Sequence, residues 1–360
     1  YIQTPEMEES FLRSTIESAV KEIIKTVSGQ FITFNRDNEQ YYLDLKKDID
    51  YDAKIQARAD FIGEDDTLNK YYYQIILKAM EWDRPEYVKD RRIYQYELLW
   101  EEKNVERTGY LFMGLPNERT TAHPPRNFYI YFLPPYGNIK YEGKIEEDEV
   151  FFEFVNRDEK VDENIKLYAA AMYMYDTSSG HSKSVYYDKA MEYQQKAVNW
   201  IRDHIKECFM VRYDGESKTI LYWLKSRAAV DVPTKDFIDM TASTCLSSYF
   251  QKKYPEYPKF SVLVTQKNTG ELLRSAINYL AGKKTEIGAQ VLKSLGLLDE
   301  DKNIVPENSK YARYYINLIN KLPEKQVLNR DEIFQWVNID EELDKRFMLE
   351  SHWVLLILCS

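Results

Sequence analysis

The sequence predicts a multi-domain α+β protein that is predominantly α, with a small antiparallel sheet and winged-helix-like modules. Three observations lead to this prediction. At 360 residues the chain is longer than one compact core usually accommodates. Apolar residues recur at helical spacing over most of its length, and four strand-like runs cluster between residues 93 and 155. Hydrophobic residues make up 44% and charged residues 30%, which is typical of a folded globular chain.

The first segment, residues 1–49, is expected to hold a helix and a β-hairpin. Residues 6–27 carry apolar side chains at helical spacing, and the runs FITFN and QYYLDL flank the polar turn RDNE. A helix followed by a hairpin is how a winged-helix module ends, so this segment is interpreted as a winged-helix remnant. The chain begins at Tyr1 and stops inside the apolar run HWVLLILCS. We therefore expect it to be a piece of a longer protein.

Residues 50–160 are expected to form an α+β domain. The pattern of residues 50–82 is mostly helical, with an interruption near Gly63. The strands that follow should build one antiparallel sheet, and prolines fall only between them, as strands require. These strands are Ile93–Trp100, Thr108–Met113, Phe128–Leu133 and Val150–Val155.

The rest of the chain is expected to be mainly helical, in two parts. Residues 161–232 should contain two long helices and a short hairpin that turns at Asp214-Gly215, a strong hairpin signal. Residues 233–360 should form a winged-helix-like region, because two helices precede LGLLDEDKNIVP, which resembles a wing. The expected helices are 164–176, 184–208, 235–253, 270–281, 285–295, 311–320 and 330–337, and the hairpin strands are 209–212 and 219–222.

Charge and cysteine usage limit the partners. A net charge of −10 argues against a protein that binds nucleic acid over its whole surface. Residues 142–163 carry ten acidic and three basic side chains, whereas residues 212–293 carry thirteen basic and eight acidic ones, so a local basic face stays open. Three scattered cysteines and no signal peptide predict a cytoplasmic protein. The apolar run Trp353–Leu358 is too short to span a bilayer, so no membrane partner is expected.

The polar loop between the second and third predicted strands holds the candidate catalytic residues. Glu118, Arg119, His123 and Arg126 lie close together there and would form an acid–base or phosphate-binding cluster. The alternative, which we favour, is that these charges pair with each other and pin the long loop to the sheet.

Three lysines are the candidate DNA-binding residues. Lys283, Lys284 and Lys293 flank the helix that precedes the predicted wing, where helix-turn-helix proteins contact phosphates of double-stranded DNA. The alternative is a solvated helix face, and winged helices also serve as protein-binding modules.

No cofactor and no metal are expected in this chain. The motifs G-x-x-x-x-G-K-[ST] and G-x-G-x-x-G are missing, and residues 215–219 are better explained as a hairpin turn than as a phosphate loop. His204 and Cys208 share one face of a predicted helix, but a zinc ion needs four ligands, and no second pair of ligands is evident.

Two stretches carry a family resemblance. The run QYYLDLKKDIDYDAKI, which starts at Gln40, and the run RIYQYELLWEEKNVERTGYLFMGLPNERTTAHPPRNFYIYFLPPY, which ends at Tyr136, resemble the middle of large bacterial phage-resistance proteins. These are P-loop ATPases of phage-growth-limitation and BREX-type defence islands. The resemblance covers most of the chain and implies an ATPase region that would precede Tyr1.

Two functions therefore remain open, besides a purely structural spacer. The first is a non-catalytic interaction and scaffold segment of a phage-defence ATPase, which binds DNA or other defence proteins. The second is an enzyme domain that acts on phosphate-bearing substrates through the loop at residues 118–126.

Overall fold

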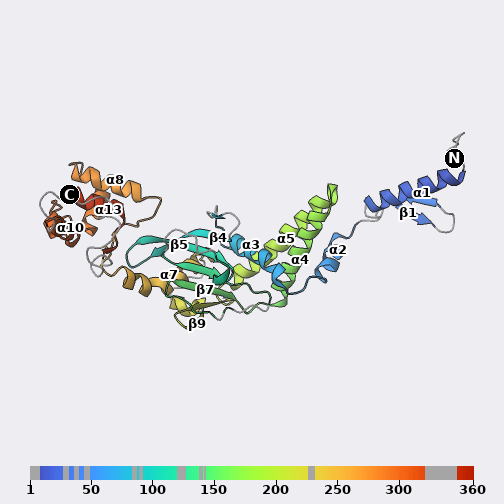
Figure 1. The fold of residues 1–360 in the computed structure, drawn as a ribbon, viewed down its shortest axis with the longest axis horizontal. Coiled ribbons are helices and arrows are strands. Elements are labelled where there is room, and N and C mark those ends of the chain that lie inside the picture. Colours follow the sequence, from blue (N-terminus) through green and yellow to red (C-terminus); the bar gives the residue numbers. More distant parts are fainter. Residues whose placement is uncertain are drawn as a thin grey trace. The chain divides into compact units, whose positions relative to one another are not determined.

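The computed structural model of the chain describes residues 9–26, 32–35, 40–43, 49–82, 87–88, 92–119, 127–137, 141, 143–225, 232–320 and 347–360. The chain divides into two compact units. One comprises residues 1–62 and 170–190, and the other comprises residues 63–169 and 191–360. The fold is α+β and predominantly helical, as the sequence predicts (Figure 1). No helix of the described residues is both long and apolar enough to cross a bilayer.

The described part of the first unit contains two helices, a hairpin and parts of two further helices. Residues Ile32 and Leu43 are opposite each other in the antiparallel hairpin, so the predicted hairpin is confirmed. The order of helix and hairpin is that of a winged-helix end, and the winged-helix interpretation itself stays a prediction. The elements are α1 (Glu9–Thr26), β1 (Ile32–Asn35), β2 (Gln40–Leu43), α2 (Tyr51–Ala59) and the adjoining parts of α4 (Glu159–Thr177) and α5 (Gly180–His204).

The second unit is built on a seven-stranded sheet in which the described strands follow one another in chain order, from β3 to β9. Its strands are β3 (Tyr87–Val88), β4 (Ile93–Trp100), β5 (Val105–Met113), β6 (Tyr129–Phe132), β7 (Glu149–Phe154), β8 (Phe209–Tyr213) and β9 (Glu216–Thr219). Its helices, besides the adjoining parts of α4 and α5, are η1 (Asp66–Leu68), α3 (Asn69–Ala79), η2 (Pro116–Glu118), α6 (Ile220–Leu224), α7 (Thr234–Lys253), α8 (Thr269–Leu280), α9 (Glu286–Ser294), η4 (Pro306–Asn308), α10 (Lys310–Asn320) and α13 (Ser351–Leu358).

The sheet is mixed, whereas the sequence predicts an antiparallel one. Strands β4 and β5 pair antiparallel, but β5–β6 and β6–β7 pair in parallel. A parallel pair needs a connection that returns the chain to the same end of the sheet, and the chain is long enough for one between β5 and β6 and between β6 and β7. Strand β6 is the middle strand, and all four of its residues are buried because both faces of the sheet are covered.

Each face of the sheet carries a layer of aromatic side chains. On the first face, the Trp100 ring lies 5.8 Å from the ring of Phe250 in α7, which runs along the sheet (Figure 1). On the second face, Tyr131 stacks on Phe151 with ring centroids 4.7 Å apart, and Tyr141 stacks on the same phenylalanine. The aromatic-rich runs of the sequence therefore form core on both faces.

The hairpin of β8 and β9 turns at the predicted Asp214-Gly215 pair. Both residues have positive φ, +47° and +77°, as the two-residue turns that suit hairpins require. The hairpin extends the large sheet because β8 pairs with β7. The prediction of a strand over residues 219–222 is wrong, because β9 ends at Thr219 and α6 follows it. Ile220 and Leu224 are buried four residues apart, so this apolar run packs as one face of a helix.

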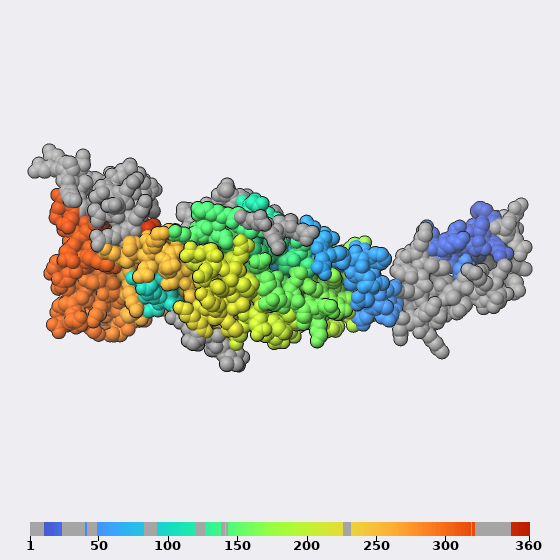
Figure 2. Space-filling model, turned by 90° about the horizontal axis from the view of Figure 1, so that it is seen from below, coloured from blue at the N-terminus to red at the C-terminus, as the bar shows by residue number. Residues whose placement is uncertain are grey.

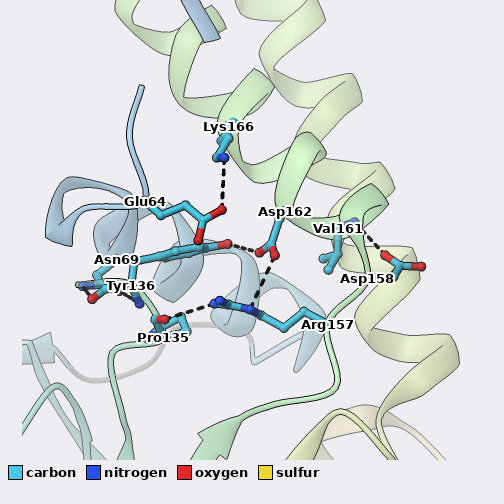
Figure 3. A network of polar contacts seen from close by, with 9 residues as sticks. All are labelled: Glu64, Asn69, Pro135, Tyr136, Arg157, Asp158, Val161, Asp162 and Lys166. Atoms are coloured by element: carbon cyan, nitrogen blue, oxygen red, sulfur yellow. Dashed lines mark hydrogen bonds and ion pairs between the residues drawn. The ribbon is translucent and has the colours of Figure 1, made fainter. Parts of the chain in front are cut away.

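A polar network joins α3 and α4 to the segment after β6 (Figure 3). The Asn69 side chain donates to the Tyr136 carbonyl oxygen (Nδ2–O 3.0 Å) and accepts from the Tyr136 amide (N–Oδ1 3.1 Å). The Tyr136 hydroxyl donates to Asp162 (Oη–Oδ1 2.6 Å), whose other oxygen lies 3.5 Å from Arg157 Nε. Burial raises the pKa of the Tyr136 hydroxyl, and the bond to Asp162 adds to this. These bonds hold the helices against one end of the sheet.

After α7 the chain returns to the sheet. Val264 donates its amide to the Asn104 carbonyl (2.8 Å), and the Glu106 amide donates to the Val264 carbonyl (2.9 Å), in a parallel bridge at the start of β5. Figure 2 shows the cyan turn between β4 and β5 against the orange segment that follows α7. Residues 257–266 are thereby held beside β5.

Helices α8 and α9 follow each other across a short turn, close to the two helices predicted over residues 270–281 and 285–295. Thr285 caps α9 by accepting the Gly288 amide (3.1 Å), and a Cβ at Gly288 would lie 2.4 Å from the Ser275 carbonyl oxygen. Leu298 and Ile304 form one antiparallel bridge where a wing is predicted, and the winged-helix assignment stays a prediction. The helix predicted over residues 330–337 lies outside the described residues.

Candidate functional site

Glu118, the first residue of the predicted polar loop, forms a local structural contact. Its carboxylate accepts from Arg92 (Nη2–Oε2 2.8 Å) and from the Leu115 amide (3.2 Å). Both partners are at the end of the sheet from which the loop departs. His123 and Arg126 lie outside the described residues, so the structure describes only the first two members of the predicted cluster.

Arg119 contacts a different set of residues. Its Nη1 donates to the Tyr129 hydroxyl (2.7 Å), its guanidinium carbon lies 4.0 Å from the centre of that ring, and its Nη2 lies 3.9 Å from Glu149 Oε1. The Tyr131 hydroxyl donates to the same carboxylate (3.1 Å), and burial raises the pKa of Glu149. Glu118 and Arg119 thus pin the beginning of the loop to the sheet through separate ion pairs. The structural alternative expected pairs within the loop, whereas the observed partners are Arg92 and Glu149.

The predicted DNA-binding lysines divide into two groups. Lys283 and Lys284 are exposed in the turn between α8 and α9, next to Gly282, whose φ is +88°. Lys293, at the end of α9, forms an ion pair with Glu300 (3.1 Å). The structure therefore leaves two of the three lysines together on one exposed turn.

A groove of about 760 Å³ among the described residues is here named the acidic groove. It lies along β4 and the first half of α7, where β4 has no described strand partner beyond Tyr94 on that edge. Five carboxylates and two lysines line it, so its charge is negative. The lining residues are Trp82, Gln95, Tyr96, Glu97, Leu99, Glu101, Glu106, Val232, Lys235, Asp236, Asp239, Met240, Ser243, Gln266 and Lys267.

Asp239 is the most buried carboxylate of the acidic groove. The Tyr96 hydroxyl donates to one of its oxygens, and Lys235 Nζ lies 2.5 Å from the other. Burial raises the pKa of Asp239, and the Lys235 ammonium opposes this shift. Nearby, the Ser243 hydroxyl donates to the Leu99 carbonyl (2.6 Å) and fastens α7 to β4. The groove wall is thus a fixed arrangement of hydrogen-bonded polar groups.

Glu106 lies on β5, opposite Leu99 and on the same sheet face as Glu97. Burial raises the pKa of Glu106, and the neighbouring Glu97 carboxylate raises it further. Its buried Oε2 has no hydrogen-bond partner among the described residues. A cationic or hydrogen-bond-donating group placed in the acidic groove would satisfy this oxygen and relieve the repulsion.

The pair His204 and Cys208 does not share an open face. The His204 ring stacks on Trp200 with centroids 4.3 Å apart and its Nδ1 lies 2.8 Å from the Trp200 carbonyl oxygen, while Cys208 is fully buried. Within the described ranges, no group of three or more histidine, cysteine or acidic residues has the geometry to hold a metal ion.

Two weak sequence signals mark the acidic groove, and our reading of the sequence missed both. Gln95 and Glu97 alternate with buried residues along β4, which places polar side chains on one face of a strand. Lys235, Asp236 and Asp239 lie within one turn of α7, which places charge on one helix face. Neither signal shows that these side chains line one groove.

The described residues thus form an α+β fold with a negatively charged groove at a strand edge. The chain belongs to the DUF6079 family. Residues 53–254 match the DUF6079 third domain, residues 1–49 match the DUF6079 second domain, and residues 269–360 match the profile described as "Family of unknown function (DUF6079) 4th domain". Comparison with curated proteins and with solved structures gives no match.

Proposed function

We propose that this chain is a non-catalytic interaction and scaffold segment of a cytoplasmic phage-defence ATPase, and that its acidic groove binds a partner protein. The defence setting and the ATPase region rest on the family resemblance of residues 40–136. The observation that carries the binding role is the acidic groove, with its five carboxylates and two lysines beside the edge of β4.

The expected occupant is an extended segment rich in lysine or arginine from another protein of the same defence system. Positive side chains would pair with Glu97, Glu101 and Asp236. The edge of β4 beyond Tyr94, which has no strand partner among the described residues, would form main-chain hydrogen bonds with an added strand. Each exposed ion pair contributes up to about 1 kcal/mol, so several are needed for specific binding. A strand that alternates basic and apolar residues would meet both requirements.

The experiment measures fluorescence anisotropy of a labelled ten-residue peptide of alternating lysine and valine, titrated with the chain. We expect saturable binding that a Glu97→Lys, Glu101→Lys double variant weakens at least about tenfold, which corresponds to about 1.4 kcal/mol. The matched control is Glu163→Lys with Glu207→Lys, which changes net charge equally at exposed positions that do not line the groove. Equal loss in both double variants would show a general charge effect and contradict the groove assignment.

Double-stranded DNA is a second candidate partner, favoured by the exposed pair Lys283 and Lys284. The turn that carries them precedes the N-terminus of α9, where helix-turn-helix proteins contact phosphates. Asp299, Glu300 and Asp301 lie on the following turn, and they oppose phosphate binding there. Anisotropy of a labelled 30-base-pair duplex at low and moderate salt tests this function. Lys283→Glu with Lys284→Glu should weaken binding and flatten its salt dependence.

The enzyme alternative draws less support from the described residues. Glu118 and Arg119 are engaged in separate ion pairs, with Arg92 and with Glu149. A phosphate-binding role would require Arg119 to leave both Glu149 and the Tyr129 ring. His123→Ala is the direct test, since a catalytic histidine would be needed for activity and not for stability.

A further inference from the structure

We propose that a second cavity of this chain binds a small carboxylate ligand, with Arg107 as its anchor. The cavity has a volume of about 380 Å³, within the range of small-molecule sites. It lies between the start of β5, the segment that follows α7 and the start of α13. Its lining residues are Val105, Glu106, Arg107, Thr108, Asn127, Tyr257, Val264, Thr265, Gln266, Thr269, Glu350, His352 and Trp353.

Arg107 is held in one position by three contacts. Its side chain is only 5% exposed, and its Nη1 donates to Glu350 Oε1 (2.7 Å). Its guanidinium carbon lies 4.1 Å from the ring centres of both Tyr254 and Tyr257, so the flat group is clamped between two rings. The Tyr257 hydroxyl donates to the second oxygen of Glu350 (2.6 Å) and fixes the carboxylate in turn.

The other edge of the same guanidinium is unused. Nε and Nη2 of Arg107 are buried, and neither has a hydrogen-bond partner in the part of the chain that the structure describes. These two nitrogens direct their N–H bonds in parallel from one edge, which matches the two oxygens of a carboxylate. Buried donors are rarely left unsatisfied in folded proteins. Arg107 lines the cavity, so a ligand that enters it can supply the missing acceptors when the side chains that cover this edge shift.

The other residues that line the cavity would contact the part of a small organic acid that lies beyond its carboxylate. Tyr257 and Trp353 supply aromatic surface, and Thr265 and Gln266 supply polar groups. His352 Nε2 is also buried without a partner among the described residues, and burial lowers the pKa of this histidine. A neutral imidazole at this position can exchange a hydrogen bond with the ligand.

The charged residues that line the cavity distinguish a monocarboxylate ligand from a phosphate. Glu350 neutralises Arg107, and the Glu106 carboxylate also lines the cavity. A doubly charged phosphate would add to this negative charge, whereas a monocarboxylate adds a single charge and places it on the unused edge of Arg107. A carboxylate is therefore favoured over a phosphate.

The test is isothermal titration of the whole 360-residue chain with benzoate and acetate, and with inorganic phosphate as comparator, at constant ionic strength. We expect saturable binding of benzoate, with phosphate at least tenfold weaker. Arg107→Lys keeps the charge but removes the paired N–H edge, so it should weaken benzoate binding at least tenfold. The control Arg92→Lys, at an exposed arginine outside the cavity, should leave the dissociation constant within twofold.

A second variant keeps the test decisive where Arg107→Lys does not fold. Gln266 is exposed at the cavity wall, so Gln266→Glu should fold and weaken benzoate binding at least threefold through charge repulsion. Absence of carboxylate binding to the unmodified chain would overturn the proposal. Phosphate binding as tight as benzoate binding, or benzoate binding unchanged in Arg107→Lys or Gln266→Glu, would overturn it equally.

Discussion

Replacing Asn69 with alanine should destabilise the second unit strongly, although the substitution removes only a small side chain. The Asn69 amide forms two hydrogen bonds with the main chain of Tyr136, one as donor (3.0 Å) and one as acceptor (3.1 Å), and both are buried (Figure 3). Alanine would leave the amide and the carbonyl of Tyr136 without these partners. The same segment also carries the hydroxyl that holds Asp162 at the start of α4.

The magnitude follows from the number of groups left unsatisfied. A hydrogen bond contributes about 0.5–1.5 kcal/mol net, and a buried polar group left unpaired costs about 1–3 kcal/mol. Two such groups give an expected loss of about 2–4 kcal/mol in the free energy of unfolding. For a domain of this size, each kcal/mol lowers the melting temperature by about 2–4 °C.

The assay is equilibrium unfolding in urea, followed by tryptophan fluorescence, on the unmodified chain and on two variants. The control is Asn164→Ala, because the Asn164 side chain donates to the Lys160 carbonyl (2.7 Å) at an exposed position within one helix. We expect the control to change stability by less than about 0.5 kcal/mol, as surface substitutions usually do. An Asn69→Ala loss no larger than that of the control would refute the reasoning that the Asn69–Tyr136 pair stabilises the unit.

Three further predictions follow from the described geometry. Gly288→Ala should lower the free energy of unfolding by at least about 2 kcal/mol, because the new Cβ would lie 2.4 Å from the Ser275 carbonyl oxygen. The control Gly270→Ala places its Cβ in open space, so the free energy of unfolding in urea should stay the same or rise slightly. Burial lowers the pKa of His352 in the folded chain. The unfolded chain therefore takes up a proton first, and the free energy of unfolding should fall as the pH drops below about 6.5. His352→Gln should flatten this part of the pH profile of unfolding. Cys359 is exposed and the other two cysteines are buried with raised pKa values, so Ellman's reagent should titrate one thiol in the native chain and three in denaturant.

The sequence predicts the positions of the strands better than their relative directions. The positions of four strands follow from apolar runs, and β4 to β7 lie close to the predicted ranges. The run YIYF in β6 is apolar at every position, and such continuity is typical of a strand covered on both faces in a parallel arrangement. The antiparallel prediction did not take this pattern into account. The parallel pairing also depends on where long connections cross, which local sequence does not determine.

Ion-pair partners were beyond the reach of local sequence for a different reason. Arg119 and Glu118 are adjacent, yet one contacts Glu149 across the sheet and the other contacts Arg92 at the end of β4. Adjacent residues in an extended or turning backbone point in different directions, so proximity in sequence gives a misleading picture of a cluster. Arg107 shows the same effect at larger scale, since its partner Glu350 is 243 residues away.

Charge counted along the chain also fails to predict the sign of a surface. Residues 212–293 carry an excess of lysine and arginine, which suggested a basic face. In the structure Lys235 and Lys267 from this segment line the acidic groove, where Glu97 of β4, Glu101 of the following turn and carboxylates of α7 outnumber them. Lys293 pairs with Glu300. The sign of a surface is set where elements from separate parts of the chain meet, and ion pairs remove charge from it. For this reason the proposed partner is a positively charged protein segment, although the linear count in this region favoured a negatively charged one.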